Sequence, residues 1–149
     1  MTEVLFYHLQ SHPLEQVLPI LLERCLERDW RALVLTGSEE RAAALNAHLW
    51  SYRDDSFLPH GSAADGHAAA QPIYLSATFV NPNHAQVLFL TDGADCEDIA
   101  AFIRCVDLFD GNDETATQAA RDRYRRAVAA GFEVTYWQQT ERGAWERRG

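Results

Sequence analysis

Short apolar runs that alternate with helix-forming stretches constrain the fold of this 149-residue chain more than any other feature. Residues 4–9 form an apolar run rich in strand formers, and residues 11–13 break it with a proline. Residues 14–25 then carry apolar side chains at three- and four-residue spacing, which is typical of a helix with one buried face. The pattern repeats with a strand at 32–36 and a helix from about residue 39 to residue 50. Two successive strand–helix units favour a parallel sheet covered by helices.

The rest of the chain continues this alternation. The patterns predict strands at 72–76, 86–91 and 132–137, and helices at 95–109 and 114–130, the last ending at Gly131. Residues 51–71 interrupt the pattern: Phe57 and Leu58 suit a short edge strand, and residues 61–70 are expected to form a flexible loop. Residues 140–149 form a C-terminal tail. We therefore expect one three-layer α/β domain over residues 1–149, with a mostly parallel central sheet of five or six strands flanked by helices.

The charge is strongly acidic but uneven. The chain has 22 acidic and 13 basic residues, a net charge of −9, and all the basic residues are arginine. Seven of the arginines fall in residues 113–149. The overall charge argues against broad binding to nucleic-acid phosphates. No 18-residue apolar run or signal peptide is recognisable, so we expect a cytoplasmic protein without a membrane segment.

The motifs of common α/β enzymes are missing from the sequence. Neither GxGxxG nor GxxxxGK[ST] occurs, so the fold is expected to be Rossmann-like without a nucleotide site. The three cysteines form no CxxC pair, the histidines form no HExxH, and no serine lies in GxSxG. No catalytic, cofactor-binding or metal-binding residues are therefore predicted. The alternative is a divergent nucleotide-binding or nucleotide-processing enzyme that uses Asp92 and His60 at strand ends.

The helix after Asp113 carries a cationic and aromatic stripe. Helical spacing places Arg121, Tyr124, Arg125 and Val128 on one face. Such a stripe suits an acidic peptide with an apolar anchor, although a plain solvated helix surface has the same composition. A further alternative is direct binding of single-stranded DNA through Tyr124, Tyr136 and Trp137. Trp50 and Phe57, if exposed, would anchor a protein partner.

Several sequence blocks stand out by their order and spacing: Val4-Leu5-Phe6-Tyr7, Leu49-Trp50, Ser56-Phe57-Leu58-Pro59-His60, Val106 to Asp113, Ala120 to Tyr124, and Ala130-Gly131-Phe132. Together they resemble the family of chi subunits of the bacterial DNA polymerase III holoenzyme. The resemblance covers nearly the full length. It implies a non-catalytic accessory subunit of the clamp-loader complex with an α/β fold and no cofactor. It also implies two partners, the psi subunit and the acidic, phenylalanine-terminated tail of single-stranded DNA-binding protein.

The resemblance also implies roles for particular residues. Arg121, Tyr124 and Arg125 would bind the tail, with Val128 as pocket wall and Leu108 or Phe109 near the apolar pocket. Trp50 and Phe57 match positions that contact psi or a DNA helicase. Thr117 departs from the family pattern, which can carry a lysine one turn before the arginine, so the affinity for the tail is expected to be lower unless another arginine substitutes.

Overall fold

The computed structural model describes residues 2–51, 60–62, 71–81, 83–96 and 98–148, with residues 50 and 51 described by their backbone alone. The helices are α1 (Leu14–Glu27), α2 (Glu39–Ser51), the short 3₁₀ helix η3 (Ile99–Ala101) and α3 (Glu114–Ala129). The strands are β1 (Glu3–Leu9), β2 (Ala32–Leu35), β3 (His60–Ser62), β4 (Ile73–Ser76), β5 (Val87–Leu90), β6 (Arg104–Asp110), β7 (Glu133–Gln139) and β8 (Trp145–Arg147).

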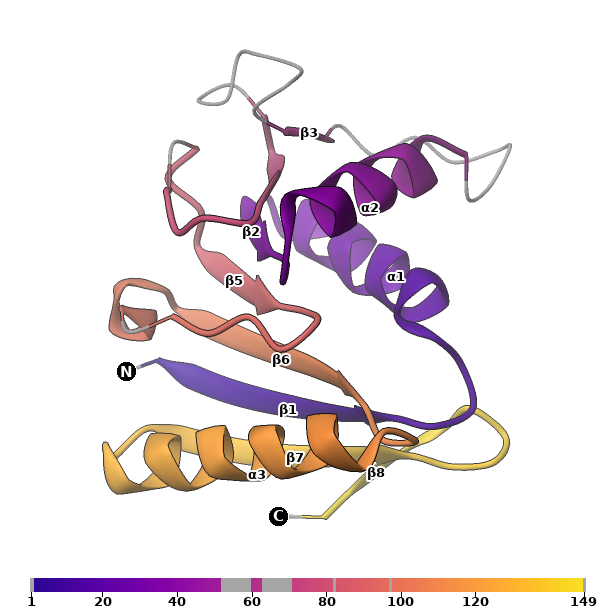
Figure 1. Cartoon of the computed structure of the whole chain (residues 1–149). Coiled ribbons are helices and arrows are strands. Elements are labelled where there is room, and N and C mark those ends of the chain that lie inside the picture. The colour runs from indigo at the N-terminus through magenta and orange to yellow at the C-terminus, as the bar shows by residue number, and fades with distance from the viewer. Residues whose placement is uncertain (1, 52–59, 63–70, 82, 97, 149) are drawn as a thin grey trace.

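The strands form one mixed, mostly parallel sheet in the order β3-β4-β2-β5-β6-β1-β7-β8 (Figure 1). Only β8 runs antiparallel to its neighbour. The described residues thus give eight strands where the sequence predicted five or six. Three of them were not predicted: β6, described below, β3, which begins at His60 and includes two residues of the predicted 61–70 loop, and β8, which lies in the C-terminal tail. Residues 63–70 and the predicted strand at Phe57-Leu58 lie outside the described residues.

Helices cover both faces of this sheet, as expected for a three-layer α/β fold. Residues of α1 and α2, such as Leu18, Leu22 and Leu45, pack with one side of the sheet in one apolar cluster. Ala120 and Ala127 of α3 pack with the other side in a second cluster. Figure 1 shows α3 running along β7. The side of α3 that is exposed to solvent therefore lies near β7 and β8.

One predicted element is wrong. The sequence predicted a helix over residues 95–109, but the structure has η3 and then the strand β6. β6 lies between β5 and β1 and is buried on both faces, with Val106 in the α1 cluster and Cys105 and Phe109 in the α3 cluster. A strand buried on both faces loses its polar alternation, so its apolar run also fits helical spacing.

The local signals that begin and end α3 act as predicted. The Asp113 carboxylate accepts hydrogen bonds from the backbone N–H groups of Thr115 (2.9 Å) and Ala116 (3.2 Å). Gly131, just beyond the helix, has a φ of 88°, a conformation that glycine adopts without a steric penalty. These two residues therefore set where α3 begins and ends.

Candidate protein-interaction site

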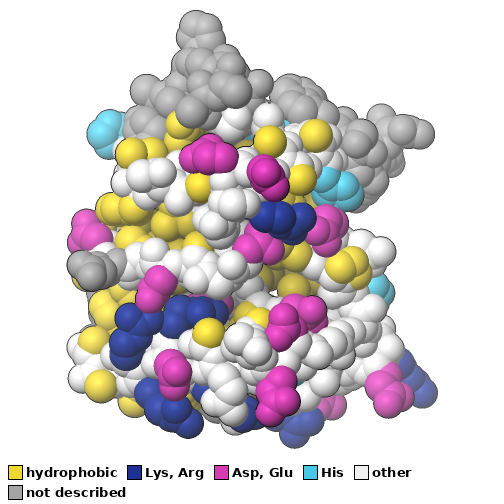
Figure 2. Space-filling model, in the orientation of Figure 1, with side chains coloured by type: hydrophobic (Ala, Val, Ile, Leu, Met, Phe, Trp, Pro, Cys, Tyr) yellow, Lys and Arg dark blue, Asp and Glu magenta, His cyan; other side chains and the backbone are white. Residues whose placement is uncertain are grey.

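Arginine side chains of α3 lie beside a concavity between the helix and the β7–β8 end of the sheet. This concavity has a volume of about 570 Å³, and a separate hollow of about 770 Å³, described below, lies elsewhere in the molecule. The residues that line it are His8, Arg121, Tyr124, Arg125, Tyr136, Gln138 and Arg148. In Figure 2, arginine side chains (dark blue) gather over the lower part of the visible face, where Figure 1 places α3. The structure thus brings together three of the predicted site residues: Arg121, Tyr124 and Arg125.

Aromatic rings form the floor of this concavity. The Tyr124 ring packs edge-to-face against Phe6 (5.5 Å between centroids) and against Tyr136 (5.9 Å). His8 stacks at an angle on Phe109 (5.1 Å) and Tyr136 (5.9 Å). These distances and tilts are those that aromatic pairs prefer. The floor is therefore aromatic and is held in place by side chains from three strands and one helix.

The α3 arginines differ in their partners. Arg123 faces the sheet and forms a buried two-point ion pair with Asp107, at 2.6 and 3.1 Å. Arg126 pairs with Asp95 at 2.5 Å, and Arg125 pairs with Asp122 at 3.0 Å on the exposed surface. Arg121 is exposed and forms no ion pair with any residue that the structure describes. Arg121 is consequently the α3 arginine whose charge is most open to an incoming anion.

The charge of Arg121 also acts on the floor beneath it. Burial lowers the pKa of His8, and the nearby Arg121 lowers it further against the opposing effect of Asp110. Burial raises the pKa of Tyr136, and Arg121 partly offsets this rise. His8 and Tyr136 are therefore uncharged near neutral pH, and the charge that lines the concavity comes from its arginines.

The other predicted tail-site residues lie at different depths. Phe109 is buried beneath the floor and touches it through its ring contacts with His8 and Tyr136 (6.0 Å). Leu108 belongs to the apolar cluster on the α1 side of the sheet, so the structure does not bring it to this concavity. Val128 is 51% exposed and lies on α3 beyond Arg125 without lining the hollow. Thr117 is buried, and its hydroxyl donates to the backbone carbonyl of Asp113.

Four lining residues were not among those predicted for the tail site: His8, Tyr136, Gln138 and Arg148. His8 and Tyr136 meet because β1 and β7 are neighbours, with Phe6 opposite Tyr136. Arg148 follows β8 and is joined to β7 by a hydrogen bond from its backbone N–H to the carbonyl of Tyr136 (2.7 Å). These residues come together because of the order of the strands in the sheet, and no local sequence motif indicates that order.

The enzyme alternative required Asp92 and His60 to act together. His60 opens β3 and lies in register with the first residues of β4, β2 and β5, whereas Asp92 follows the far end of β5. His60 is buried, and its Nε2 atom lies 3.0 Å from the carbonyl oxygen of Asn46. The two residues thus lie at opposite ends of the parallel strands, and the structure does not bring them together in one site.

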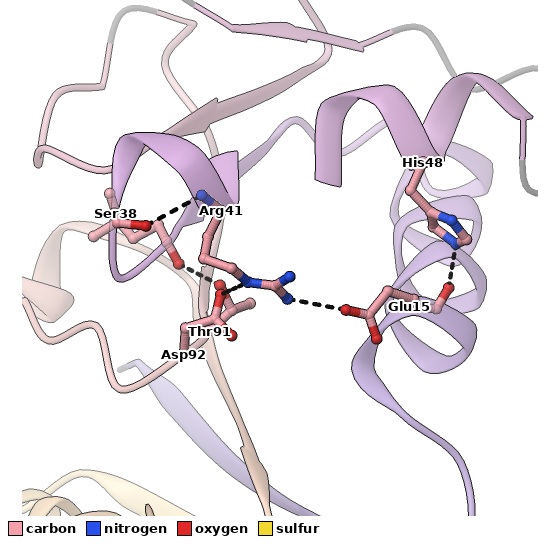
Figure 3. A network of polar contacts seen from close by, with 7 residues as sticks. Glu15, Ser38, Arg41, His48, Thr91 and Asp92 are labelled. Carbon is pink, nitrogen blue, oxygen red and sulfur yellow. Dashed lines mark hydrogen bonds and ion pairs between the residues drawn. The ribbon is translucent and has the colours of Figure 1, made fainter. Parts of the chain in front are cut away.

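Asp92 has a structural partner instead. It borders the larger hollow, at the carboxyl ends of β1, β5 and β6. Arg41 of α2 reaches between Asp92 (3.1 Å) and Glu15 of α1 (2.9 Å), as Figure 3 shows. His48 adds a contact of 2.7 Å to the carbonyl of Glu15. The network ties both helices to the end of β5, so the Asp92 carboxylate is occupied by an arginine.

The aromatic residues of the DNA-binding alternative do not share one face of the molecule. Trp137 donates a hydrogen bond to Thr135 (3.1 Å), and both point away from the face that carries Tyr136, so the three aromatic residues of the DNA-binding alternative do not form one surface. Among the described residues, no group of His, Cys, Asp and Glu has the arrangement of a metal site. No helix in the described part of the chain is long and apolar enough to cross a bilayer. The Trp50 side chain and Phe57 lie outside the described residues.

Comparison with known proteins identifies a family. The family model for "DNA polymerase III chi subunit, HolC" matches residues 1–135. A Rickettsia prowazekii (strain Madrid E) protein named "Probable DNA polymerase III subunit chi" is 33% identical over 95 residues, which are 64% of this chain and 58% of that protein. The Escherichia coli (strain K12) "DNA polymerase III subunit chi" is 28% identical over 105 residues, 70% of this chain and 71% of that protein.

Proposed function

Because the chain belongs to the DNA polymerase III chi subunit family, we propose that it is a cytoplasmic, non-catalytic adaptor in DNA replication. In this proposal it links single-stranded DNA-binding protein to the clamp loader of the polymerase. The concavity beside α3 binds the acidic, phenylalanine-terminated tail of single-stranded DNA-binding protein. Trp50 and Phe57 contact the psi subunit or a DNA helicase.

The observation that carries the tail proposal is the juxtaposition of arginines and an aromatic floor in one concavity. Arg121 supplies positive charge beside it, and Arg125 and Arg148, each in an exposed ion pair, add two further guanidinium groups on a chain whose net charge is −9. Tyr124 and Tyr136 offer rings against which an aromatic side chain can pack. An acidic peptide with an aromatic end matches both parts, whereas a bare phosphate chain would be repelled by the rest of the surface.

The expected affinity follows from the same parts. An exposed ion pair contributes about 0.2–1 kcal/mol, and burial of a phenylalanine-sized side chain adds about 1.5–3 kcal/mol. Association itself costs several kcal/mol in lost translational and rotational freedom. These contributions sum to only a few kcal/mol before that cost, so the contact should be weak, micromolar or weaker, and should weaken further with salt.

The proposal is tested by titrating a fluorescent acidic peptide that ends in phenylalanine. Arg121→Ala should weaken binding by up to about fivefold at low salt, since an exposed ion pair is worth about 0.2–1 kcal/mol. Arg126→Ala is the matched control, because it removes the same charge from the same helix but does not line the concavity. Equal binding by the wild type and Arg121→Ala would overturn the proposed site, and so would an equal loss in both variants.

A further inference from the structure

His8 and Tyr136 form a polar pair in the otherwise aromatic floor of the concavity. The Nδ1 atom of His8 lies 2.6 Å from the phenolic oxygen of Tyr136. Both side chains project from neighbouring parallel strands toward the α3 side of the sheet, and both line the hollow beside Arg121. The direction of the hydrogen bond between them decides what the tyrosine hydroxyl can offer to a ligand.

The surroundings of His8 indicate which ring nitrogen carries the hydrogen. His8 is 8% exposed, and its Nε2 atom has no hydrogen-bond partner among the residues that the structure describes. Gly111 lies directly against this side of the ring, where an added Cβ would be 2.0 Å from Nε2. A hydrogen on Nε2 would be a buried donor without an acceptor, and buried donors without partners are rarer than under-used buried acceptors.

The neutral ring has only one such hydrogen. Burial and the charge of Arg121 lower the pKa of His8, against the effect of Asp110, and so favour the neutral ring. We infer that Nδ1 carries the hydrogen and donates it to the oxygen of Tyr136. The hydroxyl hydrogen of Tyr136 must then point away from His8, where it is available to an acceptor in the concavity.

We propose that Tyr136 donates a hydrogen bond to the terminal carboxylate of the bound acidic peptide, beside Arg121, and that His8 is the positioning residue that aims it. The proposal rests on the tail-binding function proposed above. The terminal carboxylate is the natural acceptor because it is attached to the Cα of the aromatic residue that packs on the floor. A hydroxyl within that floor is therefore closer to it than to the acidic side chains that precede it.

The experiment compares two peptides of the same acidic sequence, one with a free terminal carboxylate and one with a terminal amide. Tyr136→Phe keeps the ring and removes the donor, so it should weaken binding of the free-acid peptide about tenfold, the change that corresponds to about 1.4 kcal/mol. It should weaken binding of the amide peptide less, because hydrogen bonds to neutral acceptors are about half as strong.

Two further variants separate positioning from folding. His8→Leu should weaken binding of the free-acid peptide by a smaller factor than Tyr136→Phe does. In the Tyr136→Phe background, His8→Leu should cause no additional loss, because His8 acts through the hydroxyl that is already gone. Tyr136→Phe alone leaves the Nδ1 hydrogen of His8 without an acceptor, which costs stability. The double variant removes this donor as well, so its binding reports the loss of the hydroxyl without that folding defect.

The outcomes distinguish the two proposals. If Arg121→Ala weakens binding but Tyr136→Phe binds both peptides like the wild type, the Tyr136 proposal is overturned and the tail site stands. Equal losses for the two peptides in Tyr136→Phe would also overturn it. If the wild type binds neither peptide, the tail function is wrong and the role of Tyr136 is overturned with it.

Discussion

Two arginines of α3, only two positions apart, meet opposite environments. The Arg123 side chain is 9% exposed and is held by both oxygens of Asp107 on β6, whereas Arg121 is exposed above the concavity. In a helix, positions two apart lie on nearly opposite faces. The inner face of α3 uses charge to join the helix to the sheet, and the outer face presents charge to solvent.

The contrast shows that counting arginines in a helix does not identify a binding surface. What matters is whether the neighbouring element supplies a carboxylate. Asp107 neutralises Arg123 from inside the core, and Asp95 neutralises Arg126 at 2.5 Å. Arg121 has no such partner among the described residues, whereas Arg148 across the concavity pairs with Glu146 at 3.0 Å, so the cationic character of the outer face depends chiefly on Arg121.

Asp107→Ala should give the largest effect in this comparison. Removal of the carboxylate leaves the Arg123 charge buried without a partner, and breaking a buried ion pair in this way costs about 3–5 kcal/mol of unfolding free energy. Urea unfolding followed by circular dichroism measures the change. The double variant Asp107→Leu/Arg123→Met removes both charges and should recover most of the stability. A loss as large in the double variant would mean that packing at these positions, and not charge, stabilises α3.

The same buried pair marks a limit of sequence reasoning. Cap and stop residues predicted the bounds of α3, and helical spacing predicted that Arg121, Tyr124 and Arg125 share a face. The strand β6, which supplies Asp107 and Phe109, was predicted as helix because its apolar residues face both sides of the sheet. A period of two cannot be seen in a strand that has no solvent-facing side.

The far wall of the concavity shows a second limit. Tyr136 and Arg148 come from β7 and the tail, and His8 from β1, at the other end of the chain. Their proximity follows from the order β1-β7-β8 in the sheet, which depends on long-range strand pairing. Helix faces are encoded within a few residues, whereas a site shared between strands depends on which strands become neighbours.

Gly111→Ala tests whether the floor beneath the outer face must keep its shape. An added Cβ would lie 2.0 Å from Cδ2 and Nε2 of His8 and 2.7 Å from the carbonyl oxygen of Leu9. Relieving this overlap should cost about 1–3 kcal/mol of stability and displace the His8 ring, weakening peptide binding. Thermal unfolding and peptide titration measure both effects. The loss should be smaller in a His8→Ala background, which removes the ring; an unchanged loss would place the strain at the backbone of Leu9.

Asp122→Ala should give the smallest effect on stability and sharpens the outer-face side of the comparison. Asp122 pairs with Arg125 at 3.0 Å, but the two side chains are 71% and 69% exposed, so solvent screens the pair and its loss should change unfolding free energy by less than about 0.5 kcal/mol. Without this carboxylate, Arg125 is left to the peptide, and binding should strengthen about twofold at low salt and less at high salt. Glu27→Ala, at the end of α1 on the other side of the sheet, makes the same change in net charge and should leave the affinity nearly unchanged. An equal increase in affinity in both variants would attribute the effect to overall charge. It would then contradict the proposal that the outer face of α3 is a local anion-binding site.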